Sequence, residues 1–367
     1  AGGASCALFG VADREGEGFV AAASARGRAW LTAAGFAGRL GQLVLLPGGD
    51  GSPAAAVFGY GNRGTRNRGR YHLAGAAAGL PSGDWHIEGT LTAQELDQAA
   101  LAWLFASYRF DRYKAAGPAT ARLVPPPTLD APRTLAMAEG EFLTRDLINT
   151  PASDMGPAEL EGATRALAEA FGAQLSVTTG SDLIEQNFPM IHAVGRASTR
   201  APRLLDLRWG RRGPTLTLVG KGVCFDTGGL NIKTGGSMTL MKKDMGGAAT
   251  VLGLARMIMA LDLPVRLRLL IPAVENVISG NALRPKDILV SRKGLTVEVN
   301  DTDAEGRLVL ADALALADAD RPDLLISMAT LTGAARVALG PDLPPFFCDD
   351  DRVAAALQAA GRNHADP

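Results

Sequence analysis

The sequence contains few cysteines and no long apolar run. Its three cysteines are odd in number and widely spaced, so they cannot form a closed set of disulfide bonds, which indicates a reducing compartment. No apolar run approaches the roughly 20 residues of a membrane-spanning helix, and the first residues lack the basic and apolar regions of a secretion signal. We therefore expect a cytoplasmic protein with no membrane partner.

A strong net charge is also absent. The 37 basic and 38 acidic residues give a formal net charge of −1, so the chain carries no general attraction for nucleic acid, which we do not expect as a partner. Lysine is scarce as well, because the chain has seven lysines and six of them lie between Lys221 and Lys293. The 367 residues, 47% of them apolar, predict two or three domains with sizeable cores.

The first 123 residues predict a small N-terminal α/β domain. Residues 42–62 (QLVLLPGGDGSPAAAVFGYGN) are typical of a strand, a turn and a second strand. Residues 91–113 have apolar positions at helical spacing, with Thr92 as the expected N-cap. The triplet Pro125-Pro126-Pro127 indicates a linker, and we assign 124–143 to the linker and a connecting helix.

The remaining residues, 144–367, predict a larger C-terminal α/β domain. Residues 131–151 and 157–172 have helical patterns, and Pro157 suits a first helical turn. Four later segments have the apolar character of buried strands, at 214–220, 265–274, 295–299 and 323–331, and helical patterns at 246–262 and 306–319 alternate with them. This alternation predicts a mostly parallel central sheet covered by helices on both faces.

Two polar, glycine-rich segments carry the candidate chemistry. One runs from Lys221 to Gly247 and the other from Asn300 to Arg307, each after a predicted strand. Because ligands of open α/β sheets bind beyond the carboxyl ends of the strands, we expect both segments at one site. Together they supply four carboxylates, Asp226, Asp244, Asp303 and Glu305.

Four carboxylates in one cleft predict bound cations. Without a neutralising ion they would repel one another and take up protons. Two divalent ions about 3.5–4 Å apart are a recurring device of hydrolases. Oxygen ligands suit Mg or Mn, and Zn also accepts carboxylates. A histidine-type zinc motif is excluded, because all four histidines lie outside the two segments, at His72, His86, His192 and His364.

The lysines of these segments suit two different roles. A neutral amine can bind a metal ion, whereas arginine does not lose its proton, so a ligand role explains why Lys221 is a lysine. Lys233 and Arg307 are the remaining positive groups, suited to polarising a carbonyl group and to holding an anion.

Four motifs carry a resemblance to a known family. GKGVCFDTGGLNIK (220–233), MKKDMGGAA (241–249), DTDAEGRL (301–308) and ATLTGA (329–334), in this order and spacing, resemble the leucyl aminopeptidase family, also called cytosol aminopeptidases or peptidase family M17. The resemblance is dense from about Thr144 to Leu339. The N-terminal third is assigned to the variable domain of that family by position alone.

The resemblance implies a dinuclear aminopeptidase that removes N-terminal residues from peptides, with a preference for bulky apolar first residues such as Leu. It implies one metal ion on Lys221, Asp226, Asp244 and Glu305, and another on Asp226, Asp303 and Glu305. Lys233 would stabilise the oxyanion, and Arg307 would hold a bicarbonate ion as general base. The first-residue pocket and peptide backbone would be contacted by Met241, Thr330, Leu331, Thr332 and Gly333. The family also implies a homohexamer.

Three departures from the family pattern keep alternatives open. Asp301 stands where the family usually has Asn, which places an extra negative charge beside the metals, and Cys224 replaces the usual Thr. The sequence stops at Pro367, where family members continue, so we expect the C-terminal end of the catalytic domain to be incomplete. The alternatives are a catalytically impaired member that acts as a binding or DNA-associated regulatory scaffold, and a dinuclear phosphohydrolase.

Overall fold

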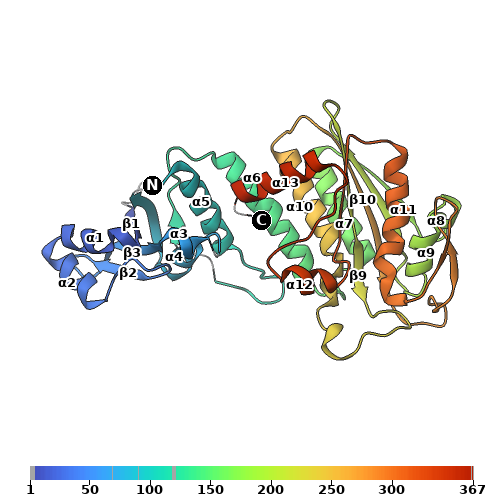
Figure 1. Cartoon of the computed structure of the whole chain (residues 1–367), viewed down its shortest axis with the longest axis horizontal. Coiled ribbons are helices and arrows are strands. Elements are labelled where there is room, and N and C mark those ends of the chain that lie inside the picture. The colour runs from blue at the N-terminus through green and yellow to red at the C-terminus, as the bar shows by residue number, and fades with distance from the viewer. Residues whose placement is uncertain (1–4, 68, 90, 118–120, 365, 367) are drawn as a thin grey trace. The chain divides into compact units, whose positions relative to one another are not determined.

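Figure 1 shows the computed structural model of the chain, which describes residues 5–364 and 366 apart from 68, 90 and 118–120. The chain forms two compact units. One consists of Ala1–Ala138 together with Gly333–Pro367, and the other of Glu139–Thr332. Within the described residues, no helix has both the length and the apolar character that a bilayer crossing requires.

The first unit contains a five-stranded sheet in the order β2 (Leu43–Pro47), β3 (Pro53–Gly61), β1 (Cys6–Ala12), β4 (Gly83–Gly89), β5 (Ala121–Leu123). β2 is antiparallel to β3, and the other neighbours are parallel. Its helices are α1 (Gly16–Ala22), α2 (Ala25–Ala33), α3 (Arg63–Arg66), α4 (Ala74–Gly79), α5 (Ala93–Ser107), α12 (Ala334–Leu339) and α13 (Asp351–Asn363). The predicted strand pair at 42–62 is therefore confirmed.

The predicted cap of α5 is also confirmed. The Thr92 hydroxyl accepts a hydrogen bond from the Glu95 backbone N–H, and the Glu95 carboxylate accepts one from the Thr92 N–H. This reciprocal pair satisfies two N–H groups that the helix itself leaves without partners. The helix ends at Ser107, six residues before the end of the predicted pattern.

The second unit contains a six-stranded sheet. Five strands follow the order β13 (Leu324–Met328), β8 (Thr215–Gly220), β10 (Arg266–Asn276), β7 (Arg203–Trp209), β6 (Gln174–Thr179), and β9 (Gly222–Asp226) pairs with the last residues of β10. β9 and β8 run parallel to β10, and β13 runs parallel to β8. β7 and β6 are antiparallel additions that the sequence patterns did not predict. The α/β fold is confirmed, and the parallel half of the sheet carries both β8 and β9, which flank Lys221.

Helices cover both faces of this sheet, as Figure 1 shows for α7 and α10 on one side and α11 on the other. α6 (Ala131–Asn149), α7 (Pro157–Phe171) and α10 (Gly246–Ala260) pack on one face, and α9 (Pro189–Gly195) and α11 (Glu305–Ala319) on the other. α8 (Asp182–Glu185) completes the unit. Along β10, Leu267, Leu269 and Ile271 belong to the first core, whereas Leu270 and Val274 belong to the second. This alternation is the two-residue period of a strand buried on both faces.

One strand prediction was wrong. The segment 295–299 was expected to be a buried strand, but β12 (Thr296–Glu298) forms a separate two-stranded antiparallel sheet with β11 (Ile288–Val290). Leu289 and Val297 pack against the second core, while the side chains that alternate with them are exposed. The polar residues Thr296 and Glu298 around Val297 are typical of a strand with one solvated face.

A buried carboxylate fixes α11, which begins with Glu305. Asp312 on α11 is fully buried and accepts backbone N–H bonds from Met190 at 2.8 Å, from Ile191 at 3.4 Å and from Arg292 at 2.8 Å. The first two donors belong to the first turn of α9, where a helix leaves its N–H groups without internal partners. Asp312 therefore joins α11 to α9 and to the segment after β11.

Replacing Asp312 with alanine is expected to lower the free energy of unfolding by about 3 kcal/mol, because three buried N–H groups lose their acceptor. Asp318→Ala is the matched control on the same helix, since Asp318 is exposed and pairs only with Lys293 at 3.1 Å in the part of the chain described. Its cost should stay below about 0.5 kcal/mol. Urea unfolding of both variants tests this, and equal shifts of the two midpoints would contradict the role of Asp312.

Candidate active site

The structure brings the candidate carboxylates and lysines together at the end of β8 and β9. Lys221 lies between these strands, and Asp226 is the last residue of β9. Asp244 lies in a 3₁₀ turn, Met241–Met245, which leads into α10. Asp303 lies in a second 3₁₀ turn, Thr302–Ala304, and Glu305 opens α11.

The two lysines bridge the carboxylates in pairs. Lys221 Nζ lies 2.8 Å from Asp244 Oδ2 and 3.0 Å from Glu305 Oε1. Lys233 Nζ lies 2.9 Å from Asp226 Oδ2 and 2.5 Å from Asp303 Oδ1. The sequence predicted one common site for these six residues, and the structure places them in one ion-pair cluster.

Most of this cluster is excluded from solvent. Lys221, Asp226 and Asp244 are each 2% exposed and Glu305 is 1% exposed. Glycine makes room for the Lys221 side chain, because a Cβ atom on Gly306 would lie 2.6 Å from Lys221 Cε and 2.7 Å from its Nζ. The backbone of β13 likewise lies close to Gly247, because a Cβ atom on Gly247 would lie 2.1 Å from the Met328 carbonyl oxygen.

The cluster carries more negative than positive charge. Four carboxylates face two ammonium groups, which leaves two negative charges uncompensated within the cluster. Burial raises the pKa of Glu305 to about 7; Lys221 opposes this, and the charges of Asp226 and Asp244 add to it. Burial also raises the pKa of Asp303, against the effect of Lys233. Such crowded carboxylates favour the entry of a cation.

The residues present fit a divalent cation. Oxygens of Asp226, Asp244 and Glu305 all lie within 4.8 Å of one another. Asp244 Oδ2 and Asp303 Oδ1 are buried, and in the described residues the partner that each oxygen faces is a lysine ammonium group. Carboxylate oxygens are ligands that Mg, Mn and Zn accept. The arrangement therefore offers an oxygen-rich cage in which lysine ammonium groups are the present partners of the carboxylates.

The residues predicted to contact substrate lie around Asp244. Met241 opens the same 3₁₀ turn and is half-buried. The Thr330 hydroxyl lies 2.7 Å from Asp244 Oδ1, and Lys221 Nζ donates to the Thr330 carbonyl at 3.3 Å. Leu331 is 44% exposed. Thr332 ends this unit, and Gly333 is the first residue of the segment that groups with the other unit.

Arg307 differs from the two lysines. It is exposed on the first turn of α11, and none of the described residues forms an ion pair with it. Its guanidinium group is therefore available to an anion from solution.

Sequence reasoning missed two side chains that hold the cluster together. Thr302 is fully buried, donates to the Gly228 carbonyl at 2.6 Å and accepts from the Asn231 N–H at 2.8 Å. Asn276, at the end of β10, donates to Asp226. Thr302 lies inside the motif DTDAEGRL, and Asn276 ends an apolar strand. The rule that functional groups follow parallel strands would have found Asn276.

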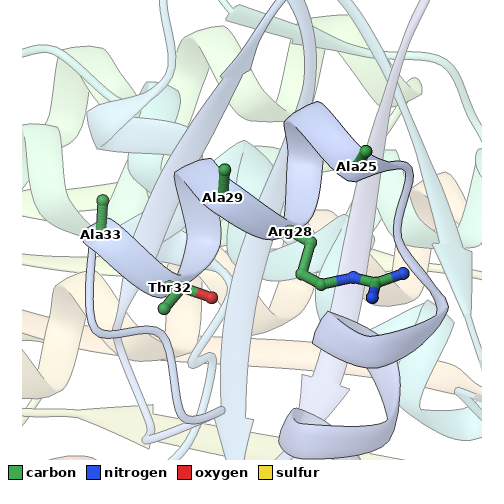
Figure 2. A pocket seen from close by; sticks show the side chains of 5 residues that line it. All are labelled: Ala25, Arg28, Ala29, Thr32 and Ala33. Carbon is green, nitrogen blue, oxygen red and sulfur yellow. The ribbon is translucent and has the colours of Figure 1, made fainter.

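A separate hollow lies in the first unit. Figure 2 shows it along α2, where it has a volume of about 500 Å³ and is lined by Ala25, Arg28, Ala29, Thr32 and Ala33. A single helix supplies this lining, and Arg28 is its only charged member. It therefore lacks the converging polar groups of a binding pocket.

A buried cluster of carboxylates and lysines beside the carboxyl ends of parallel strands is typical of a metal-dependent hydrolase. Residues 142–367 match the cytosol aminopeptidase family, catalytic domain, and residues 8–126 match the M17 aminopeptidase N-terminal domain. The chain belongs to the cytosol aminopeptidase family, peptidase family M17, and is an aminopeptidase and metallo-exopeptidase of that family.

Individual relatives agree with this assignment. A probable cytosol aminopeptidase of Rhodococcus jostii (strain RHA1) is 38% identical over 357 residues, which cover 91% of this chain and 71% of that protein. Peptidase B of Enterobacter sp. (strain 638) is 46% identical over 231 residues, 61% of this chain and 54% of that protein.

Solved structures show the same fold. The cytosol aminopeptidase of Coxiella burnetii superposes with a TM-score of 0.94 at 44% identity, covering 100% of this chain and 80% of that one. The bottromycin maturation enzyme BotP, in complex with Mn, superposes with a TM-score of 0.86 at 34% identity, covering 99% of this chain and 80% of that one. The predicted family and the predicted fold are both confirmed.

Proposed function

We propose that this aminopeptidase uses two divalent ions, Zn or Mn with Mg as the alternative, to hydrolyse the N-terminal peptide bond of peptides. The observation that carries the proposal is the buried cluster, in which carboxylate oxygens of Asp226, Asp244 and Glu305 lie within 4.8 Å of one another. Lys221, Asp226, Asp244 and Glu305 would hold one ion. Asp226, Asp303 and Glu305 would hold the other, so that Asp226 and Glu305 bridge the two.

The bound ions would supply Lewis acidity and lower the pKa of a water molecule. Lys233 supports the reaction by its position, because its ammonium group is fixed between Asp226 and Asp303 and stays charged. It would stabilise the negative charge that develops on the carbonyl oxygen of the substrate. Arg307 would bind bicarbonate, and this anion is the proposed general base.

The residues around Asp244 support a preference for bulky apolar first residues such as Leu. Met241 precedes Asp244 by three residues on the same turn, and Leu331 follows Thr330, whose hydroxyl contacts Asp244. The Leu331 side chain is 44% exposed and therefore accessible to a ligand. Together with Thr332 and Gly333, these residues would line the first-residue pocket.

We further propose a cytoplasmic homohexamer, with 124–143 connecting an N-terminal domain at 1–123 to the catalytic domain.

The test is hydrolysis of leucine p-nitroanilide after chelator treatment and reloading with Mn²⁺ or Zn²⁺. We expect activity that is lost on chelation, returns with metal, and is absent on N-acetyl-leucine p-nitroanilide, whose blocked amine cannot bind as a free N-terminus does. The p-nitroanilides of alanine, lysine and glutamate should be hydrolysed more slowly than the leucine compound. Equal turnover of the acetylated substrate, or no metal uptake, would contradict the proposal.

A further inference from the structure

Asn276 occupies a central position in the cluster although it carries no charge. It is 3% exposed and is the last residue of β10. Its Nδ2 donates to Asp226 Oδ1 at 2.9 Å and to the Thr302 carbonyl at 3.0 Å, and lies 3.5 Å from Glu305 Oε2. A carboxamide has two N–H donors, so the first two bonds use both and the contact with Glu305 is a shared, longer one.

The backbone of Asn276 holds the same region. Its carbonyl oxygen accepts the Thr227 N–H at 2.9 Å and the Thr227 hydroxyl at 3.1 Å. A bulge in β9 places Asp226 opposite Asn276 in the pairing of β9 with β10. Val223 pairs with Val274 and Phe225 with Glu275, so Cys224 is the additional residue of the bulge. Bulges beside active sites commonly re-aim a side chain in this way.

The loop beside Asn276 is shaped to admit its side chain. Gly229 has a φ of +64°, and a Cβ atom at this position would lie 3.0 Å from Asn276 Oδ1 and 2.9 Å from Thr302 Oγ1. A glycine therefore permits the close approach of the carboxamide and the hydroxyl. Asn276 thus connects three segments, the end of β9, the glycine loop and the turn that leads into α11.

We propose that Asn276 is a positioning residue for metal binding: it orients Asp226 directly and fixes the turn that carries Asp303 and Glu305. The proposal rests on the proposed function, because it assigns Asn276 to the same metal centre. Asp226 Oδ1 receives two protein hydrogen bonds, from Asn276 and from the Gly228 N–H at 2.8 Å. These bonds limit rotation of the carboxylate, so that Asp226 Oδ2 faces Lys233 Nζ at 2.9 Å. Groups that orient metal ligands in this way strongly affect metal affinity.

The experiment is calorimetric titration of Mn²⁺ into chelator-treated protein, with the wild type, Asn276→Leu and Thr164→Val. Leucine keeps the branched shape of asparagine, although it is larger, and has no donor, so the Kd for Mn²⁺ should rise by about 10–100-fold. Thr164→Val is the matched control, because Thr164 is fully buried in the same unit and donates to the Leu160 carbonyl, away from the cluster. It should bind Mn²⁺ as the wild type does even where its melting temperature falls.

A second readout separates orientation from general stability. The visible absorption spectrum of bound Co²⁺ reports the arrangement of the ligands, and it should change in Asn276→Leu and stay unchanged in Thr164→Val. Should Asn276→Leu not fold, Asn276→Ser replaces it in both measurements. Serine is smaller than asparagine, and its hydroxyl is too short to reach Asp226. If the variants bind Mn²⁺ with wild-type affinity, Asn276 has only a structural role and this proposal is wrong. If the wild type itself takes up no Mn²⁺, the proposed function fails and this proposal fails with it.

Discussion

Replacing Lys221 with arginine is expected to weaken metal binding on the order of 100-fold or more and to abolish most aminopeptidase activity, although the charge is kept. A metal-binding lysine must supply a neutral amine, and a guanidinium group does not lose its proton. The site also has no room for the larger group, because α11 approaches so closely that a Cβ atom on Gly306 would lie 2.7 Å from Lys221 Nζ. Measuring Mn²⁺ affinity by calorimetry and activity on leucine p-nitroanilide tests this expectation.

Two further variants separate the ligand role from simple charge balance. Lys293→Arg is the control, because Lys293 is exposed and pairs with Asp318 at the surface. Metal affinity and activity of this variant should stay at wild-type values. Lys221→Met keeps the length of the side chain but removes both the charge and the amine. If Lys221 served only as an ammonium counter-ion to Asp244 and Glu305, its removal would strengthen the binding of a competing cation. A ligand role predicts the opposite, and tighter Mn²⁺ binding by Lys221→Met would contradict it.

Sequence reasoning succeeded where the information was local. The cap at Thr92 is formed by residues three positions apart, and the carboxylates of the two glycine-rich segments lie where a strand ends or a helix begins. The second segment was nevertheless misplaced. It follows the hairpin strand β12 rather than a strand of the central sheet, and its position at the cluster comes from α11, which packs on that sheet.

The contacts that orient the cluster were not predictable, because they join residues far apart in the sequence. Thr330 lies 86 residues from Asp244, Asn276 lies 50 residues from Asp226, and Asp312 lies 122 residues from Met190. No periodicity or motif spacing encodes such pairs, which depend on the order of the strands and the packing of the helices. Strands β7 and β6 were not predicted, because polar residues such as Asp206 in β7 and Ser176 in β6 interrupt the apolar pattern of a buried strand.

Asp301 shows how the structure refines a concern raised by the sequence. The aspartate was expected to place an extra charge beside the metals where the family has asparagine. It is exposed, and its Oδ1 accepts the Asp303 N–H at 2.9 Å, a bond that the oxygen of an asparagine also makes. The local geometry of the turn is therefore kept. The charge contributes to the raised pKa of Asp303, after burial and the charge of Asp226.

Lys233→Met is expected to separate catalysis from metal binding. Turnover should fall by about 10²–10³-fold, because the substrate oxyanion loses its positive partner. Mn²⁺ affinity should not fall and should increase several-fold, on the order expected from removing one screened charge. The ammonium group lies 2.9 Å from Asp226 Oδ2 and 2.5 Å from Asp303 Oδ1, so it competes with a cation for these oxygens.

The decisive comparison sets Lys233→Met beside Lys221→Met. Both variants remove one lysine from the same cluster, yet the assigned roles predict opposite changes in Mn²⁺ affinity, a decrease for Lys221 and an increase for Lys233. Steady-state kinetics adds a second criterion, since loss of an interaction made only in the transition state lowers kcat and kcat/KM together and leaves KM nearly unchanged. A Lys233→Met protein that has lost its metal would show that Lys233 supports the metal site rather than the reacting carbonyl group.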